Sequence, residues 1–110
     1  MTARELAQSL ELVRLGTGGD DERPVVTGYV CDLLSYVMGR APQGCAWITI
    51  MANLNVAAVA VLSDVTCVIL VEGVKPDAML MKKAEDENVL LYGTSLDAYT
   101  LAWRIRELIG

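Results

Sequence analysis

Hydroxyl and amide side chains gather at two places in this chain where a small polar ligand could be held. Thr49, Asn53 and Asn55 follow a short β-branched run and precede an unbroken apolar segment, and Thr94 and Ser95 follow a second apolar run. Such side chains donate and accept hydrogen bonds, and α/β folds hold ligands at the carboxyl ends of their strands. The same residue types are also good helix caps. Both groups are therefore candidate ligand-binding residues for which capping is the competing role.

Side chains that commonly drive catalysis are scarce. The sequence has no histidine, which removes Ser-His and Cys-His activation of a nucleophile. No pair of carboxylates has a spacing that favours acid–base catalysis, and no Lys or Arg stands in a phosphoryl-transfer motif. The glycine-rich loop at 16–19 could offer backbone N–H groups to a phosphate, but it lacks the Gly-Lys-Ser/Thr of a P-loop. We expect no catalytic residue and no enzymatic activity.

The cysteines and acidic residues do not form a metal-binding pattern. Cys31, Cys45 and Cys67 are odd in number, widely spaced and set among apolar residues, as small buried hydrophobes are. The acidic run at 20–22 lacks the alternation of a calcium loop and is typical of a solvated surface. We therefore expect no disulfide framework, no metal, no cofactor and a cytoplasmic location.

Composition limits the partners that the chain could bind. Its formal net charge is −5, and its cations are scattered without a basic stripe, so we expect no nucleic-acid partner. Hydrophobic residues make up 54% of the sequence and the mean hydropathy is +0.40, yet polar residues interrupt every long apolar run. We expect no membrane segment, and we assign the apolar surplus to a sheet covered on both faces or to a surface buried in an oligomer.

Helical and strand patterns alternate along the whole chain. Thr2 and Glu5 form a capping-box pattern, and Asp32 and Asp77 are placed to cap later helices. The predicted helices lie near 3–10, 33–38, 54–62 and 78–88 and in a last segment ending near 109, and the predicted strands near 12–15, 25–30, 45–50, 66–71 and 89–92. This alternation predicts one α/β domain over 1–110, with a mainly parallel sheet and helices on both faces.

The last predicted helix carries more apolar surface than a monomer needs. One stripe of apolar residues on this helix is placed to pack against a sheet. At about 100° per residue, Leu96, Tyr99 and Trp103 fall on the opposite side of the helix. Exposed aromatic and aliphatic side chains together are typical of a partner surface, so we expect a homodimer interface there. The alternatives are shielding by the loop at 16–24 or by the first helix, and an interface on the outer side of 54–62.

Several segments in a fixed order resemble the DRTGG domain family, in particular its small stand-alone bacterial and archaeal branch. They are GYVCDLLSYVM at 28–38, WIT at 47–49, NLNVAAVAVL at 53–62 and LYGTSLDAYTLA within 90–102. The resemblance covers about 25–110 and also takes in Gly73, Pro76-Asp77 and Ala84. Where the family has its D-R-T-G-G-like segment after the central strand, this chain reads Met51-Ala52-Asn53-Leu54-Asn55.

The resemblance implies an α/β fold similar to the N-terminal domain of HPr kinase/phosphorylase. Such domains occur beside phosphotransacetylases and inside nucleotide-regulated pyrophosphatases, usually as dimerising or regulatory modules without chemistry of their own. We therefore expect a non-catalytic, homodimeric regulatory or interaction module that could sense a small anion or nucleotide near 49–55. The alternatives are a phosphotransfer-related enzyme or subunit acting with a partner protein, and a module that binds only a protein partner.

Overall fold

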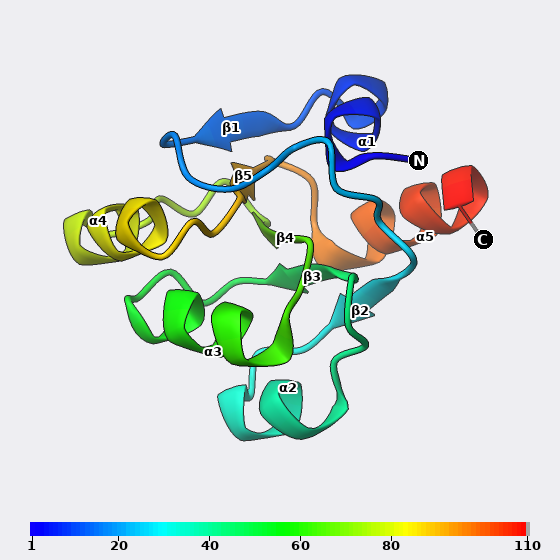
Figure 1. Ribbon diagram of the computed structural model, residues 1–110. Helices are drawn as coiled ribbons and strands as arrows, with labels where there is room; N and C mark the ends of the chain where they lie inside the picture. The colour runs from blue at the N-terminus through cyan, green and yellow to red at the C-terminus, as the bar shows by residue number, and fades with distance from the viewer. Residues whose placement is uncertain (110) are drawn as a thin grey trace.

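The sheet of this protein has five strands in the order β1-β5-β4-β3-β2 (Figure 1). In the computed structural model, which describes residues 1–109, four of them are parallel: β2 (Gly28–Val30), β3 (Ala46–Thr49), β4 (Cys67–Leu70) and β5 (Leu91–Gly93). The first strand, β1 (Val13–Leu15), pairs antiparallel with β5 at one edge. The predicted mainly parallel sheet is confirmed.

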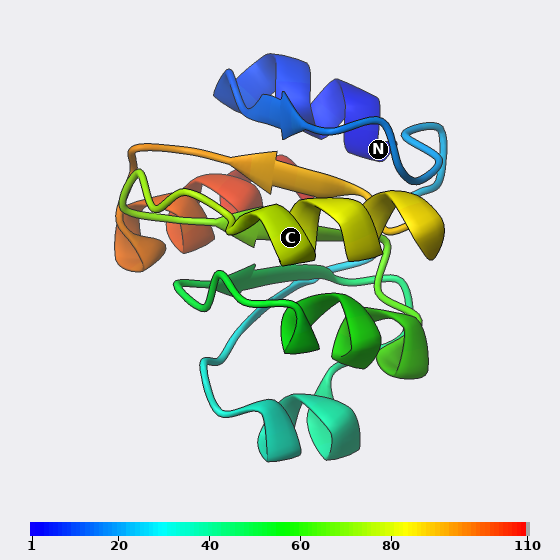
Figure 2. The ribbon, with the colours of Figure 1, turned by 90° about the vertical axis from the view of Figure 1, so that its left-hand side faces the viewer.

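Helices cover both faces of this sheet, as predicted (Figure 2). Helices α2 (Leu34–Arg40), α3 (Asn55–Ser63) and α4 (Ala78–Asp86) connect successive parallel strands and lie on one face. Crossovers share one hand, so strands that are added in one direction place all their connecting helices on the same side. Helices α1 (Ala3–Leu10) and α5 (Ala98–Ile109) pack on the other face.

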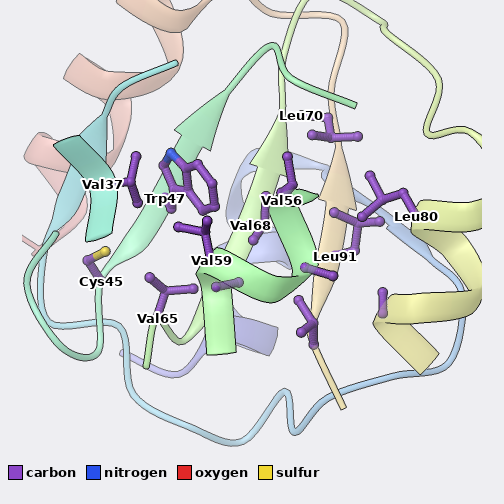
Figure 3. Close-up of a cluster of buried hydrophobic side chains, with 14 residues drawn as sticks. Val37, Cys45, Trp47, Val56, Val59, Val65, Val68, Leu70, Leu80 and Leu91 are labelled. Carbon is purple, nitrogen blue, oxygen red and sulfur yellow. The ribbon is translucent and has the colours of Figure 1, made fainter. Parts of the chain in front are cut away.

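The two central strands explain the long uncharged runs in the sequence. Every residue of β3 and of β4 is buried, as expected where both faces of a parallel sheet are covered. On the side of α3, Trp47, Val56 and Leu70 belong to one core cluster (Figure 3). On the side of α5, Ile48 and Leu101 belong to a second. Within residues 1–109, no helix has both the length and the apolar character needed to cross a bilayer.

The apolar helix α3 is less enclosed than its sequence predicts. We expected protein on both of its sides because it is apolar all round. Val56 and Ala60 are indeed buried, but Val61 is 46% exposed and Leu62 is 73% exposed. One side of α3 therefore presents apolar side chains to solvent, which leaves the outer side of 54–62 open as a contact surface.

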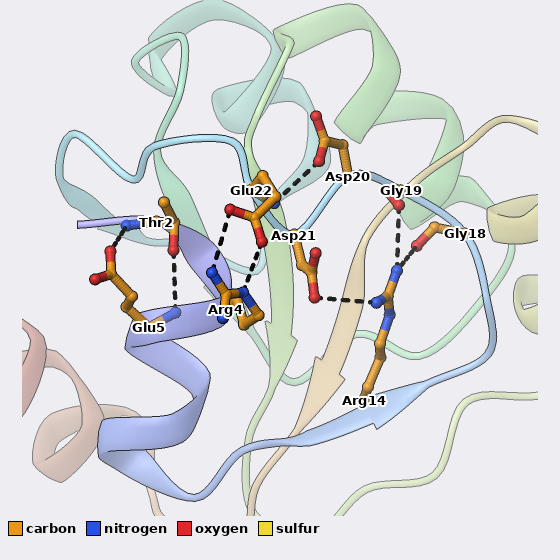
Figure 4. A network of polar contacts seen from close by, with 9 residues as sticks. All are labelled: Thr2, Arg4, Glu5, Arg14, Gly18, Gly19, Asp20, Asp21 and Glu22. Atoms are coloured by element: carbon orange, nitrogen blue, oxygen red, sulfur yellow. Dashed lines mark hydrogen bonds and ion pairs between the residues drawn. The ribbon is translucent and has the colours of Figure 1, made fainter.

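Of the caps predicted at Thr2, Asp32 and Asp77, two are confirmed and one is wrong. The Thr2 hydroxyl accepts from the backbone N–H of Glu5, whose carboxylate accepts from the N–H of Thr2 in return (Figure 4). Asp77 caps α4 by accepting from the N–H of Leu80 at 2.7 Å. Asp32 does not cap α2, which begins after residue 33 without a side-chain cap, because its carboxylate is engaged by residues at the end of β3.

Polar contacts tie the glycine-rich loop at 16–24 to the body of the domain. Arg14 donates to the carbonyls of Gly18 and Gly19 and pairs with Asp21, while Arg4 pairs with Glu22 at 2.7 Å (Figure 4). Gly18 is buried where the chain passes from α4 to β5, and a Cβ at this position would lie 2.5 Å from the carbonyl oxygen of Ala84. The loop is therefore a packed part of the structure.

Substitution by alanine should change the stability of the protein in opposite directions at Gly18 and at Gly39. Gly18→Ala should lower the free energy of unfolding by roughly 1–3 kcal/mol, because the methyl group forces buried backbone apart. Gly39→Ala should raise it by about 0.5–1 kcal/mol, because Gly39 lies in α2 and its Cβ would meet nothing within 4 Å. Urea unfolding at one fixed protein concentration measures both, and equal effects would contradict the packing of the loop.

Candidate functional site

Thr49 ends β3 and is buried within a small polar network. Its hydroxyl donates to Oδ1 of Asp32 at 2.8 Å and accepts from the backbone N–H of Met51 at 3.1 Å, and its exposed fraction is 1%. The same Asp32 oxygen accepts from the N–H of Ile50 at 2.9 Å. The network joins the chain after β2 to the chain after β3. The Thr49 hydroxyl therefore has hydrogen-bond partners within the protein and needs no ligand to satisfy it.

The cavity beside Thr49 is small and acidic. Its volume is about 110 Å³, and Asp32 and Glu72 both belong to its lining. Ligand pockets usually span about 300–1,000 Å³, and two carboxylates repel an anion. These acidic surroundings disfavour the anionic ligand that we expected near 49–55 from the sequence.

The two asparagines lie at the start of α3. Oδ1 of Asn53 accepts from the backbone N–H of Asn55 at 3.0 Å, so Asn53 serves the turn that begins the helix. Asn55 is the first residue of α3 and its side chain is exposed. Neither asparagine belongs to the lining of the cavity beside Thr49. Thr49 therefore shares neither a hydrogen bond nor a cavity lining with the two asparagines.

Thr94 and Ser95 follow β5 and line a different, larger cavity of about 380 Å³. Thr94 Oγ1 accepts from the backbone N–H of Leu96 at 3.2 Å, while Ser95 is exposed. The cap of α5 is Asp97, whose carboxylate accepts from the N–H of Thr100 at 2.7 Å. The Thr100 hydroxyl, and after it this hydrogen bond from the backbone, lower the pKa of Asp97. The expected capping role of Thr94 and Ser95 thus belongs to Asp97.

Two cations in this larger cavity were missed from the sequence. The lining combines the hydroxyls with charged and apolar groups from four parts of the chain: Leu10, Glu11, Val13, Leu15, Gly73, Val74, Lys75, Gly93, Thr94, Ser95, Leu96 and Arg104. Lys75 stands in the connection before α4, and Arg104 is one of several charged residues on α5. No motif joins them, because they are 29 positions apart (104 − 75) and only the fold brings them to one cavity.

The predicted dimer residues are partly exposed, with one correction. Tyr99 is 82% exposed and Trp103 is 45% exposed on α5, and both line a groove of about 310 Å³ beside β2. Leu96 is not part of this surface. It precedes α5 and packs half-buried against the core, because its turn reverses the chain between β5 and the helix. The exposed surface therefore consists of Tyr99, Trp103 and the neighbouring edge of the sheet.

Two of the three cysteines are buried as expected and poorly placed for nucleophilic chemistry, whereas Cys31 is only half-buried. Cys45 and Cys67 are buried, and burial raises the pKa of the Cys45 thiol to about 11 and that of Cys67 to about 12. Thiols with pKa values this high are almost entirely protonated near neutrality and therefore react slowly. Among residues 1–109, no group of three or more His, Cys, Asp or Glu side chains could hold a metal ion.

The network around Thr49 should contribute to stability. Thr49→Val keeps the shape of the side chain and removes the hydroxyl, so the free energy of unfolding should fall by about 2 kcal/mol, as for hydrogen bonds to charged groups. Thr17→Val makes the same change at an exposed loop position and should stay within roughly 0.5 kcal/mol of the parent. Urea unfolding compares the two. Equal stabilities would show that the hydroxyl does not link β2 to β3.

Comparison with known proteins gives a likeness in structure but none in sequence. No protein-family model matches this chain, and no curated protein matches its sequence. The solved structure of the CBS and DRTGG domains of the regulatory region of Clostridium perfringens pyrophosphatase, complexed with its activator diadenosine tetraphosphate, is similar with a TM-score of 0.72 and 16% identity. The match covers 94% of this chain and 45% of that chain, so this chain spans less than half of its length. The likeness shows the fold, which is DRTGG-like.

Proposed function

We propose that this chain is a non-catalytic regulatory module that forms a homodimer and responds to a small anionic ligand such as a nucleotide. Its fold is similar to part of a regulatory region that was solved with a nucleotide activator. Cys45 and Cys67 are buried thiols with raised pKa values, and the Thr49 hydroxyl is hydrogen-bonded within the chain, so none of these three groups is poised as a nucleophile. These features support a binding role over the alternative of a phosphotransfer enzyme or subunit.

The observation that best supports a homodimer is the unpaired outer edge of β2. Thr27 and Cys31 bond to β3 through their backbone groups, at 2.8 Å to Ala46 and 3.2 Å to Ile48. Because strand residues alternate, the backbone N–H and C=O groups of Gly28 and Val30 point away from β3, where no further strand follows. The strand carries no charged residue that would block pairing with another chain.

The β2 strand of a second copy of the chain could pair with this edge across a two-fold axis that passes through Tyr29. In an antiparallel pair of β2 strands centred there, Gly28 lies opposite Val30 of the second copy, and Val30 lies opposite its Gly28. Both residues have outward N–H and C=O groups, so each pair exchanges two hydrogen bonds. The surface is then self-complementary, as a two-fold interface requires.

The side chains around β2 add apolar contacts on both faces of the sheet. Val30 is 49% exposed on the strand, and Tyr99 and Trp103 flank it from α5. Leu33 and Tyr36, which precede and begin α2, are 58% and 51% exposed on the other side. Aromatic side chains in a central position are the residues that most often carry binding energy at interfaces. This distribution supports a dimer through β2 and α5.

Light scattering on the purified protein at micromolar concentration should give twice the mass of the chain. Val30→Lys places a charge in the paired edge, and Trp103→Asp removes an aromatic anchor worth about 2 kcal/mol or more, so each should weaken the dimer at least about tenfold. Each variant must keep its helical circular dichroism spectrum to be informative.

Leu62→Asp provides the matched control and tests the other surface. Leu62 is 73% exposed on α3, on the face of the sheet opposite α5. The proposal expects Leu62→Asp to remain a dimer. Dissociation of Leu62→Asp alone would move the interface to the outer side of 54–62, and a monomeric parent protein would refute the homodimer.

A further inference from the structure

The cavity of about 380 Å³ lies where two connections of the sheet leave in opposite directions. After β4 the chain runs to α4 on one face, and after β5 it runs to α5 on the other (Figures 1 and 2). The N–H of Gly73 donates to the carbonyl of Thr94 at 2.9 Å, so the two connections touch before they separate. Open α/β sheets bind ligands beyond the carboxyl ends of strands where successive connections diverge in this way.

Two of the four cations outside the ion pairs line this cavity. The chain has nine Lys and Arg residues, and the ion pairs within residues 1–109 engage five of them: Arg4, Arg14, Arg23, Lys82 and Lys83. Lys75 and Arg104 are outside those pairs, and both line the cavity, with the Arg104 guanidinium 5.8 Å from the centre of the Trp103 ring. In a protein with a formal net charge of −5, two cations outside ion pairs at one cavity favour an anion there. Another cavity is also lined by two cations, Arg4 and Arg14, but both are ion-paired.

Neutral and acidic groups complete the lining. Thr94 Oγ1 already accepts from Leu96, so its hydroxyl proton remains available to a ligand, and Ser95 presents a second hydroxyl. Glu11 contributes a carboxylate, which accepts hydrogen bonds but repels phosphate. Val13 and Val74 supply apolar wall. The lining therefore combines cationic, hydrogen-bonding and apolar groups, which suit a negatively charged group, hydroxyl groups and an apolar ring.

We infer that this cavity binds a phosphate monoester bearing sugar hydroxyl groups, the chemical class to which mononucleotides belong. Lys75 and Arg104 contact the phosphate, Thr94 and Ser95 donate to it, and Glu11 accepts from the hydroxyl groups. This inference rests on the proposed function, since it names the ligand class and the site for the regulatory module. It also moves the ligand from the network of Thr49 to the carboxyl end of β5.

Isothermal titration calorimetry with four probes tests the ligand class. Adenosine monophosphate and ribose 5-phosphate contain both phosphate and sugar hydroxyls, whereas inorganic phosphate and adenosine each lack one part. The inference expects binding of at least one monoester, at least tenfold tighter than either partial probe. Equal affinity for the two monoesters would identify sugar phosphates as the class, and tighter binding of the nucleotide would show that the base contributes. The inference would be overturned if neither monoester bound, or if inorganic phosphate or adenosine bound as tightly as the monoesters.

Arg104 and Arg106 provide a matched pair of variants. Both are exposed on α5, but Arg106 lines the groove beside β2 instead of this cavity. Arg104→Ala and Lys75→Ala should each weaken monoester binding roughly tenfold or more, the effect of losing a hydrogen bond to a charged group. Arg106→Ala removes the same charge and should leave the affinity within about twofold. An equal loss in Arg106→Ala would show nonspecific attraction and contradict the site.

The dimer and the ligand site can fail independently. Each variant is sized by light scattering in the calorimetry buffer, and Val30→Lys is titrated beside the parent protein. Monoester binding by a monomeric parent protein would retain the site and refute the homodimer, whereas binding by a monomeric Val30→Lys variant would show only that the site does not need the dimer. A dimer that binds neither monoester would retain the interface and refute the ligand class.

Discussion

Burial of the central strands on both faces is the constraint on which this structure depends. Strands β3 and β4 present no exposed residue, so helices must cover both sides of the sheet. Three crossover helices occupy one face because the parallel strands are added in one direction. The other face must then be covered by the two ends of the chain, α1 and α5. The same requirement sends the connection after β5 away from the side of α4.

This change of side creates the cavity at the carboxyl end of β5. The connections to α4 and α5 diverge there, and the chain around 10–15 closes the remaining side. At the other end of the sheet, β2 has a neighbour on one side only, and α5 lies across the nearby face. The two features are therefore consequences of the same chain path. The proposed ligand site at one end and the free strand edge at the other are compatible with a module that couples ligand binding to association.

The network of Thr49 and Asp32 shows how a polar strand end can serve the fold. Both hydrogen-bonding capacities of the Thr49 hydroxyl are used within the chain, and Asp32 accepts from two residues at once. A buried hydroxyl without such partners would cost about 1–3 kcal/mol. The sequence pattern of polar residues after a strand is identical for a ligand site and for a structural network. Partner atoms from a distant segment decide between them.

The sequence by itself determined the fold class, most element positions and two of the caps, because periodicity, capping and burial act over a few neighbouring residues. It also indicated the exposed Tyr99 and Trp103, since helical spacing separates them from the buried stripe. Only the tertiary structure decided that Leu96 packs inward, that Asp32 binds Thr49, and that Lys75 and Arg104 share a cavity. These outcomes depend on contacts between segments far apart in the chain, and no local pattern encodes such distances.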